Sequence, residues 1–311
     1  MMKIAIVGAG MSGLACADRL TALGHQVKLF DKARGPGGRM STRRMSTDAG
    51  EASFDHGAQY FTVRDARFQS VVDGWHAAGV AAPWLAVSSD AWVGTSSMNA
   101  PIKWMAARHE VAWSTRIEVI QRQGNEWVLL GEGVSPTCFD AVVVAVPAEQ
   151  AAVLLAPIQH EFSALAKATV SAPCWTLMLA FTEPLKTEVT TLKDDPVIGW
   201  AACNSTKPAR TGPHSWVVQA SAQWSIDHLE DTQESVQGAL TQRFADCLGI
   251  SLPAPLVAVA HRWRYAQTSG SAHTALYNPA IKLGVCGDWL LAPRVECAWL
   301  SGQALAELIL K

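Results

Sequence analysis

Residues 3–31, KIAIVGAGMSGLACADRLTALGHQVKLFD, decide the fold. The run KIAIV is apolar and rich in β-branched residues, so it predicts a short buried strand. The glycine turn GAGMSG follows directly. Residues 14–23 then predict a helix that stops at Gly24, and QVKLF predicts a second strand. Strand, glycine turn, helix and strand in this order predict the βαβ unit that binds a dinucleotide.

Each glycine of this turn has its own physical role. Gly8 makes the tight turn, Gly10 lets a pyrophosphate approach the backbone, and Gly13 lets the helix and the strand pack closely. The helix N-terminus, with Met11 and Ser12, offers free N–H groups and a positive dipole end to phosphates. The alternative is a glycine-rich turn of an α/β protein that binds nothing.

A second glycine-rich loop follows Asp31, whose carboxylate can accept hydrogen bonds from ribose hydroxyls. The loop begins at Lys32 and reads KARGPGGRMS, so that Gly38 stands beside Arg39 and Met40. Glycine allows a close backbone approach, and the planar guanidinium of Arg39 suits a pyrophosphate. The alternative is a solvated basic loop that contains Arg34, Arg39, Arg43 and Arg44.

The composition excludes several classes of protein. The 311 residues include 49% hydrophobic and 17% charged residues with a net charge of −2, which suits a globular protein of one large or two medium domains. A basic surplus for nucleic acid, an apolar run of about 18 residues for a membrane span and a secretory signal are all absent from the sequence. Seven cysteines without metal-binding spacing indicate free thiols in the cytoplasm and no metal site.

The segment FDHGAQYF, residues 54–61, is the next candidate for function. Gly57 permits close approach to a flat ring, and the side chains of Gln59 and Tyr60 are able to line a pocket. For His56 and Tyr60 the alternative is a buried hydrogen-bonded pair in a turn.

Two further segments carry polar residues for which the sequence leaves two alternative roles open. Residues 94–99, GTSSMN, precede a predicted helix, so they either contact a ligand or simply cap that helix. Residues 261–265 read HRWRY, in which His261 or Arg262 faces a pocket or lies on the solvent face of a strand.

Periodicity predicts the remaining elements. Helices are expected over 65–78, over 101–108 and from an N-cap at Asp231 to a stop at Gly249. Strands are expected over 84–93, 139–146, 175–181, 197–201, 215–221, 257–265 and 281–286, and an antiparallel pair over 111–119 and 126–130.

The C-terminal region completes a resemblance to a known family. The strand 281–286 leads into Gly287-Asp288, and PRVECAWLSG then begins a helix near Val295. With the glycine turn, the GGR loop, the DHGAQY segment and the Gly-x-x-x-Met segment, this region resembles the FAD signatures of the flavin-dependent amine oxidase superfamily. Within that superfamily the motifs look most like those of bacterial renalases, and the resemblance spans nearly the whole chain.

The resemblance implies an α/β fold with a Rossmann-like FAD-binding domain of the glutathione-reductase and amine-oxidase type and an inserted α+β substrate domain. The FAD-binding domain is expected over 1–62, 95–150 and 256–311. The substrate domain is expected over 63–94 and 151–255.

The resemblance also implies the site residues. Ile117 is expected to bind adenine through its backbone, Asp288 the ribityl-phosphate region, and the helix at Val295 the flavin ring. FAD, bound non-covalently, is expected to contact Gly8, Gly10, Met11, Ser12, Gly13, Asp31, Lys32, Gly38, Arg39, Met40, Asp55, His56, Ile117, Asp288 and Val295. The substrate is expected to contact Gly57, Ala58, Gln59, Tyr60, Phe61, Ser96, Ser97, Met98 and Arg294.

The reaction that the resemblance implies is the oxidation of isomeric dihydronicotinamides, the 1,2- and 1,6-dihydro forms of NAD(P). Hydride passes to flavin N5, and O₂ reoxidises the flavin and yields hydrogen peroxide. We expect a monomer or a weak dimer. A small FAD-dependent amine oxidase is the alternative enzyme, although an aromatic-flanked Gly-Tyr for an amine cage is missing from the sequence. A flavin-binding protein without turnover is the alternative of another class.

Overall fold

The predicted βαβ unit is present. The elements β1 (Lys3–Val7), α1 (Met11–Ala22) and β2 (Gln26–Phe30) follow in order, and the two strands pair in parallel. The helix was predicted to begin after the glycine turn, at residue 14. α1 instead begins at Met11, so that Gly13 lies in its first turn. These coordinates come from a computed structural model, which describes residues 1–135 and 137–310.

The unit belongs to a six-stranded sheet of order β17-β18-β11-β1-β2-β7. β11 (Ala141–Val144), β18 (Leu283–Val285) and β7 (Glu110–Ala112) continue the parallel arrangement, and β17 (Leu276–Asn278) is an antiparallel edge strand. All four residues of β11 are buried, as its apolar run predicts for a central parallel strand. Ligands of such sheets bind beyond the carboxyl ends of the strands.

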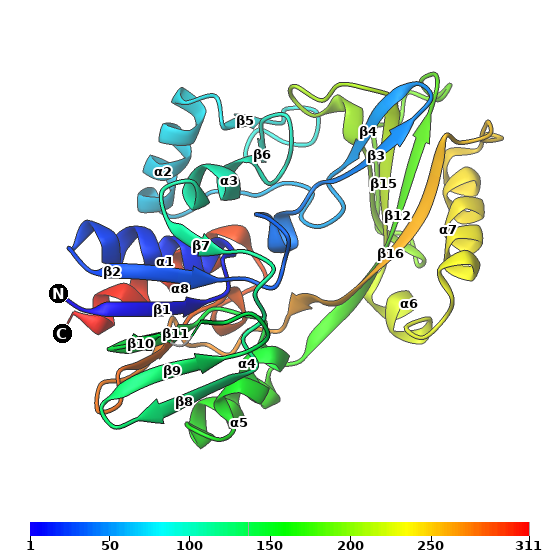
Figure 1. Cartoon of the computed structure of the whole chain (residues 1–311). Helices are drawn as coiled ribbons and strands as arrows, with labels where there is room; N and C mark the ends of the chain where they lie inside the picture. The colour runs from blue at the N-terminus through cyan, green and yellow to red at the C-terminus, as the bar shows by residue number, and fades with distance from the viewer. Residues whose placement is uncertain (136, 311) are drawn as a thin grey trace.

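Helices cover one face of this sheet. α8 (Val295–Ile309) packs against α1, and α2 (Ala66–Ala77) and α3 (Ala100–Ala106) join the same hydrophobic cluster. Figure 1 shows α1 and α8 side by side, with both chain termini at the same end of the sheet.

The other face of the sheet carries a small antiparallel sheet and two helices. The sheet consists of β10 (Cys138–Phe139), β9 (Glu126–Leu130) and β8 (Val119–Gln123). The helices α4 (Ala148–Leu155) and α5 (His160–Ala168) pack beside it.

A second, antiparallel sheet forms the other half of the molecule (Figure 1). Its strand order is β13-β14-β15-β12-β16. The strands are β12 (Ser171–Phe181), β13 (Thr191–Lys193), β14 (Ile198–Cys203), β15 (His214–Ala220) and β16 (Val257–Thr268). The helices α6 (Ala222–Asp227) and α7 (Gln233–Leu248) lie along this sheet, and the hairpin of β3 (Arg43–Thr47) and β4 (Gly50–Phe54) packs on the face away from α7.

Three predicted elements are wrong in detail. Residues 84–91 form a loop between β5 (Ala81–Pro83) and β6 (Trp92–Gly94), because Trp84 turns its indole into the core. The strand expected over 111–119 is divided, since β7 joins the parallel sheet and β8 pairs with β9. The N-cap of α7 is the hydroxyl of Thr232, because the Asp231 carboxylate bonds His228 instead.

Three segments pack differently from the expected division into domains. Phe68 and Trp75 of α2 join the core of α1 and α8, although residues 63–94 were expected in the substrate domain. α4 and α5 pack on the parallel sheet, and β16 belongs to the antiparallel sheet. The exact domain boundaries stay a prediction.

No helix among the described residues is both long and apolar enough to cross a membrane. Nor does the described part of the chain gather three or more His, Cys, Asp or Glu side chains where they would hold a metal ion.

The contact between α1 and α8 leaves no room for a side chain at Gly302. Alanine substitution is therefore expected to change the stability in opposite directions at Gly302 and at Gly238, which lies outside this contact. A Cβ at Gly302 would collide with the carbonyl oxygen of Ser12, whereas a Cβ at Gly238 in α7 would meet no atom within 4 Å. We expect Gly302→Ala to lower the free energy of unfolding by about 1–3 kcal/mol through overpacking. We expect Gly238→Ala to raise it by about 0.5–1 kcal/mol through helix propensity. Urea unfolding of both variants measures these changes, and equal effects at the two positions would contradict the packing.

Candidate functional site

The glycine turn after β1 has the geometry that its sequence predicts. Gly8 has a φ of +108°, and a Cβ there would collide with the carbonyl oxygen of Ala145. A Cβ at Gly13 would collide with the carbonyl oxygen of Gly8, whereas a Cβ at Gly10 would meet no atom within 4 Å. The fold itself therefore requires Gly8 and Gly13, and Gly10 leaves open space before α1.

The N-terminus of α1 has the properties of an anion-binding site. Met11 and Ser12 form its first turn, and no side chain caps it. The first N–H groups of a helix have no acceptor within the helix, and the dipole is positive there. A phosphate group placed before Gly10 would satisfy these donors.

Asp31 is already hydrogen-bonded within the protein. Its two carboxylate oxygens accept from the backbone N–H groups of Ala9 and Ala33, each at 2.8 Å. Each oxygen keeps a second lone pair, so a ribose hydroxyl can still donate to it. The next residue, Lys32, donates its Nζ to the side-chain oxygen of Gln150 at 3.0 Å.

An ion pair joins the second and third predicted motifs. Nη2 of Arg39 lies 2.5 Å from Oδ1 of Asp288, although the two residues are far apart in sequence. Gly38 has a φ of +53°, and Met40 is buried beneath the loop. The carboxyl end of the parallel sheet therefore brings this guanidinium and this carboxylate together, a pairing that the sequence motifs did not predict.

The GGR loop also supports the DHGAQY segment. The backbone N–H of Ala58 donates to the carbonyl oxygen of Arg39 at 2.8 Å, and a Cβ at Gly57 would collide with that oxygen. The missing side chain of Gly57 therefore makes room for protein backbone, and contact of Gly57 with a flat ring stays a prediction.

The N-terminus of α8 lies over the 61–65 segment. The buried carboxylate of Glu296 accepts from the backbone N–H groups of Arg64 at 2.6 Å and Asp65 at 2.7 Å. Nη1 of Arg294 lies 3.1 Å from Oε2 of Glu296 but forms no hydrogen bond with a described residue. No side chain caps the helix, which begins at Val295 as predicted. Free donors therefore gather at this helix end.

Ile117 lies outside the strands. It is a buried residue in the segment between β7 and β8, and the strand expected around it is absent. The same segment is fixed to Asp31, whose carbonyl oxygen accepts from Thr115 N–H at 2.8 Å. A contact of the Ile117 backbone with adenine stays a prediction.

Asp55 holds protein segments together and is not free for a cofactor, contrary to expectation. Its fully buried carboxylate accepts from Thr42 Oγ1 at 2.6 Å and from Met98 N–H at 2.9 Å. Lys207 Nζ at 3.1 Å and Arg210 Nη2 at 2.6 Å complete its partners. Burial opposes its charge, but these two cations and the hydroxyl outweigh burial and hold the pKa of Asp55 well below its usual value.

His56 packs in a group of three rings. Its ring lies 5.1 Å from both His261 and Trp263, and the indole N–H of Trp263 donates to the His56 carbonyl oxygen at 2.8 Å. Burial, followed by His261 and Arg43, lowers the pKa of His56 to about 4. Burial and Arg43 also lower the pKa of His261. Both imidazoles are therefore neutral at pH 7.

A row of side chains across the antiparallel sheet faces the DHGAQY segment. Trp200, Gln219, Thr176 and His261 are directly opposite one another on β14, β15, β12 and β16, and opposite residues share a face. Gln219 Nε2 donates to the Gly57 carbonyl oxygen at 2.8 Å, and the Trp200 ring lies 5.6 Å from Tyr60. We name these four residues the sheet row.

The prediction that Arg262 faces the pocket is wrong. Strand alternation points it away from the sheet row, and its guanidinium lies 5.4 Å above Trp175, in the cluster that packs against α7. It also bonds Glu230 at 2.9 Å and the carbonyl oxygen of Leu229. His261 is the residue of the pair that faces the other half of the molecule.

Several predicted substrate contacts are core residues. Phe61 packs between Phe68 and Trp75, and the Met98 side chain is fully buried. Ser97 is also buried and bonds Asn99 at 2.8 Å, whereas Ser96 is exposed with a φ of +63°. These placements correct the expectation of direct contact by Phe61, Ser97 and Met98.

Among the remaining predicted substrate residues, Gln59 is buried and Tyr60 is half-buried. Gln59 contributes its side-chain oxygen to Lys207 Nζ at 3.3 Å. The half-buried Tyr60 stays a candidate for substrate contact, together with Gly57, Ala58 and Arg294.

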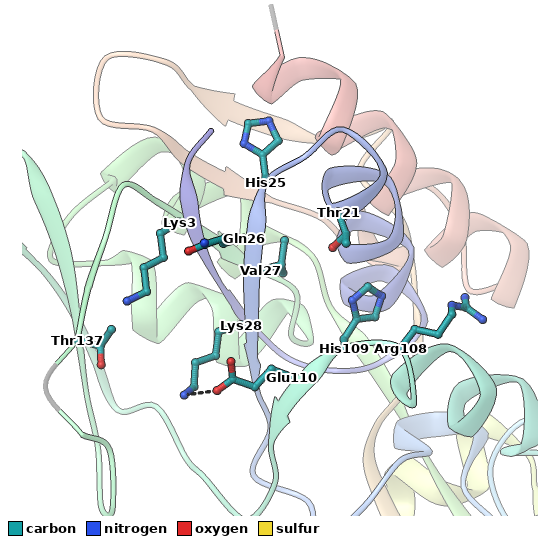
Figure 2. Close-up of a pocket in the computed structure, with 10 residues that line it drawn as sticks. All are labelled: Lys3, Thr21, His25, Gln26, Val27, Lys28, Arg108, His109, Glu110 and Thr137. Carbon is teal, nitrogen blue, oxygen red and sulfur yellow. Dashed lines mark ion pairs between the residues drawn. The ribbon is translucent and has the colours of Figure 1, made fainter.

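A cavity of about 410 Å³ lies away from these motifs (Figure 2). It surrounds the first half of β2 at the amino end of the parallel sheet, and its lining includes Lys3, His25 and Lys28. Lys28 is paired with Glu110 at 2.6 Å. Because the glycine turn and Asp288 lie at the opposite, carboxyl end of the strands, this cavity is not the candidate site.

Comparison with known proteins identifies the family. The profile described as flavin containing amine oxidoreductase matches residues 86–310. The chain belongs to this family. A second profile, an NAD(P)-binding Rossmann-like domain, matches residues 6–75, which include the glycine turn and the GGR loop of this amine oxidoreductase.

Individual relatives agree with this family. Mouse renalase is 25% identical over 300 residues, which cover 87% of this chain and 86% of the relative. A putative protoporphyrinogen oxidase from Exiguobacterium has a similar fold, with a TM-score of 0.78, 12% identity and coverage of 99% and 98%. Cyclohexylamine oxidase from Brevibacterium oxydans gives a TM-score of 0.72 at 13% identity, with the same coverage. These structures establish the fold of the amine oxidoreductase, an α/β Rossmann-like half with a substrate half.

The family implies a flavin cofactor, and the residues present fit one. The space at Gly10 and the uncapped α1 suit phosphates, and Arg39 suits a pyrophosphate. At the other end, the uncapped N-terminus of α8 suits a ring that gains negative charge on reduction, and Arg294 lies beside it in an ion pair with Glu296.

Four residues of this candidate site were not predicted from the sequence. Lys207 and Arg210 lie in a loop without any motif, and Trp200 and Gln219 lie in ordinary strands. The sequence contained one weak indication of a functional residue in β15. Gln219 is a polar residue between the buried apolar residues Val218 and Ala220.

The ion pair between Arg39 and Asp288 predicts an effect on flavin retention. We expect Arg39→Ala to lower the flavin content of the purified protein severalfold, because it removes the guanidinium and leaves the buried Asp288 carboxylate unpaired. Absorbance at the flavin band relative to 280 nm measures the content. Arg44→Ala is the matched control, since Arg44 contacts Glu51 at 3.5 Å in an exposed hairpin. Full flavin content in Arg39→Ala would remove Arg39 from the binding site.

The buried His56 predicts loss of stability in acid. Its folded pKa of about 4 lies below the unfolded value, so the unfolded chain binds the proton first as the pH falls from 6.5 to 4. We expect this histidine to contribute a loss of about 2–3 kcal/mol between pH 7 and pH 4.5. Urea unfolding of the wild type and of His56→Gln at both pH values isolates it, with exposed His160→Gln as the control. The same acid loss in all three proteins would contradict the assignment.

Proposed function

We propose that this amine oxidoreductase is an FAD-dependent oxidase of isomeric dihydronicotinamides, namely 1,2- and 1,6-dihydro-NAD(P). FAD binds non-covalently, and the products are NAD(P)⁺ and hydrogen peroxide. The similarity to mouse renalase over most of both chains and the motifs from Gly8 to Asp288 support this proposal.

The uncharged sheet row is the observation that favours this substrate class. Trp200, Gln219, Thr176 and His261 carry no carboxylate, and His261 is neutral. The nearby carboxylate of Asp55 is already compensated by two cations. A cationic amine therefore meets no free negative charge, whereas a neutral dihydropyridine ring can pack against indole and amide groups.

The residues have distinct roles in this mechanism. FAD, when bound, supplies the ring that accepts hydride and reacts with O₂. The N-terminus of α8 and Arg294 stabilise negative charge that develops beside them. Trp200 and Tyr60 orient a flat ring by packing, and the half-buried Trp263 limits water beside the two imidazoles. Because a dihydropyridine is already a hydride donor, the substrate half-reaction needs no general base.

We also propose that the protein works in the cytoplasm as a monomer or a weak dimer, with O₂ as the electron acceptor. The free cysteines and the absence of a basic surplus support a small-molecule substrate in a reducing compartment.

Anaerobic stopped-flow mixing tests the substrate class. We expect 1,2- and 1,6-dihydro-NAD to bleach the flavin at least 100-fold faster than ordinary 4-dihydro-NADH or primary amines at equal concentration. Fast bleaching by amines alone would overturn the proposal in favour of an amine oxidase, which the resemblance to cyclohexylamine oxidase makes the second candidate. A flavin that none of these reductants bleaches would indicate a binding protein without turnover.

A further inference from the structure

Three charged side chains meet in the interior, at the junction of the two halves of the molecule. The side chains of Asp55 and Lys207 have no exposed surface, and that of Arg210 is 1% exposed. Both cations contact the same oxygen of Asp55, at 3.1 Å from Lys207 Nζ and 2.6 Å from Arg210 Nη2. We name this group the Asp55 cluster. Its formal charge is +1.

The Asp55 cluster fixes the segment that contains Gly57 and Tyr60. Asp55 begins this segment, and Lys207 Nζ lies 3.3 Å from the side-chain oxygen of Gln59 within it. The Gln59 amide in turn donates to the carbonyl oxygens of Asp55 and Gly57. The loop that contains Lys207 therefore determines where this segment lies relative to the sheet row.

The same cluster fixes the segment 94–98. The backbone N–H of Met98 donates to Asp55 Oδ1 at 2.9 Å, and Arg210 Nη1 donates to the Gly94 carbonyl oxygen at 2.9 Å. The two segments that the family resemblance assigned to the substrate site are thus attached to one buried carboxylate, although Ser97 and Met98 themselves lie in the core.

The energetics argue that this arrangement serves geometry more than stability. Burial, together with the nearby Arg210, lowers the pKa of Lys207 to about 8 in spite of the attraction of Asp55. Buried ion pairs often add no net stability compared with apolar side chains of similar volume. Their directional contacts, however, define one arrangement of the backbone groups around them.

We propose that Lys207 and Arg210 are positioning residues for the reaction. Through the Asp55 carboxylate they hold the segments 55–60 and 94–98 in one arrangement at the substrate site. Lys207 acts mainly on the first segment through Gln59, and Arg210 acts mainly on the second through Gly94. The identity of the substrate rests on the proposed function, whereas the fixing of the two segments does not.

Hydrogen exchange of the flavin-loaded protein, read by mass spectrometry, tests the structural part. We expect Arg210→Met to speed exchange in peptides covering 94–98 by at least 10-fold, and Lys207→Met to act more on 55–60. Arg243→Met is the matched control, because it removes an ion pair with Asp195 at α7, away from both segments. Peptides covering β15 should stay unchanged in all variants. Unchanged exchange in both segments of both cluster variants would overturn the proposal.

Flavin reduction tests the consequence for the reaction. We expect the limiting rate at saturating 1,2-dihydro-NAD to fall at least 10-fold in Arg210→Met, with flavin content and thermal midpoint close to those of Arg243→Met. Arg210→Lys should restore part of the rate, and Arg210→Gln replaces Arg210→Met in both measurements if the latter fails to fold. A limiting rate within twofold of the wild type would contradict a positioning role.

The two proposals fail in different ways. If the substrate class is wrong, wild-type flavin itself is not reduced by dihydro-NAD isomers, and the comparison of variants is made with the amine that does reduce it. The exchange measurement requires no substrate, so it decides the fixing of the two segments in every case.

Discussion

Close backbone contacts that only glycine permits determine this structure. Gly13 lies against the carbonyl oxygen of Gly8, Gly57 against that of Arg39, and Gly302 against that of Ser12. Each contact joins two elements at a distance that a Cβ would prevent, and together they bring β1, α1, α8 and the GGR loop to one edge of the parallel sheet. The phosphate-binding geometry is therefore part of the packing of the core.

The charged residues around the sheet row determine the electrostatic character of the part of the candidate site that the antiparallel sheet forms. Around the sheet row, Asp55 is the buried carboxylate, and Lys207 and Arg210 outweigh it. Burial, followed by neighbouring charges that include Arg43, lowers the pKa values of both nearby imidazoles. The surroundings of the sheet row are thus neutral to positive, which disfavours a protonated amine.

The sequence predicted the parts of the site whose function depends on local backbone. The roles of Gly8, Gly13 and the helix start at Val295 follow from short motifs, and the structure confirms their geometry. Lys207 and Arg210 escaped prediction because a basic loop is ordinarily solvated and only the tertiary fold buries it. The choice between His261 and Arg262 depended on which face of β16 the other half of the molecule covers, and one strand alone does not contain that information.

The ion pair between Arg39 and Asp288 has a consequence for synthesis of the chain. The first half of the cofactor site leaves the ribosome early, whereas Asp288 and α8 emerge after nearly all other elements. Until then β11 lacks its partner β18, and the helix that covers α1 is missing. Without α8 the apolar face of α1 is exposed and the Asp288 partner of Arg39 is missing, so stable flavin retention requires segments from both ends of this sequence to fold together.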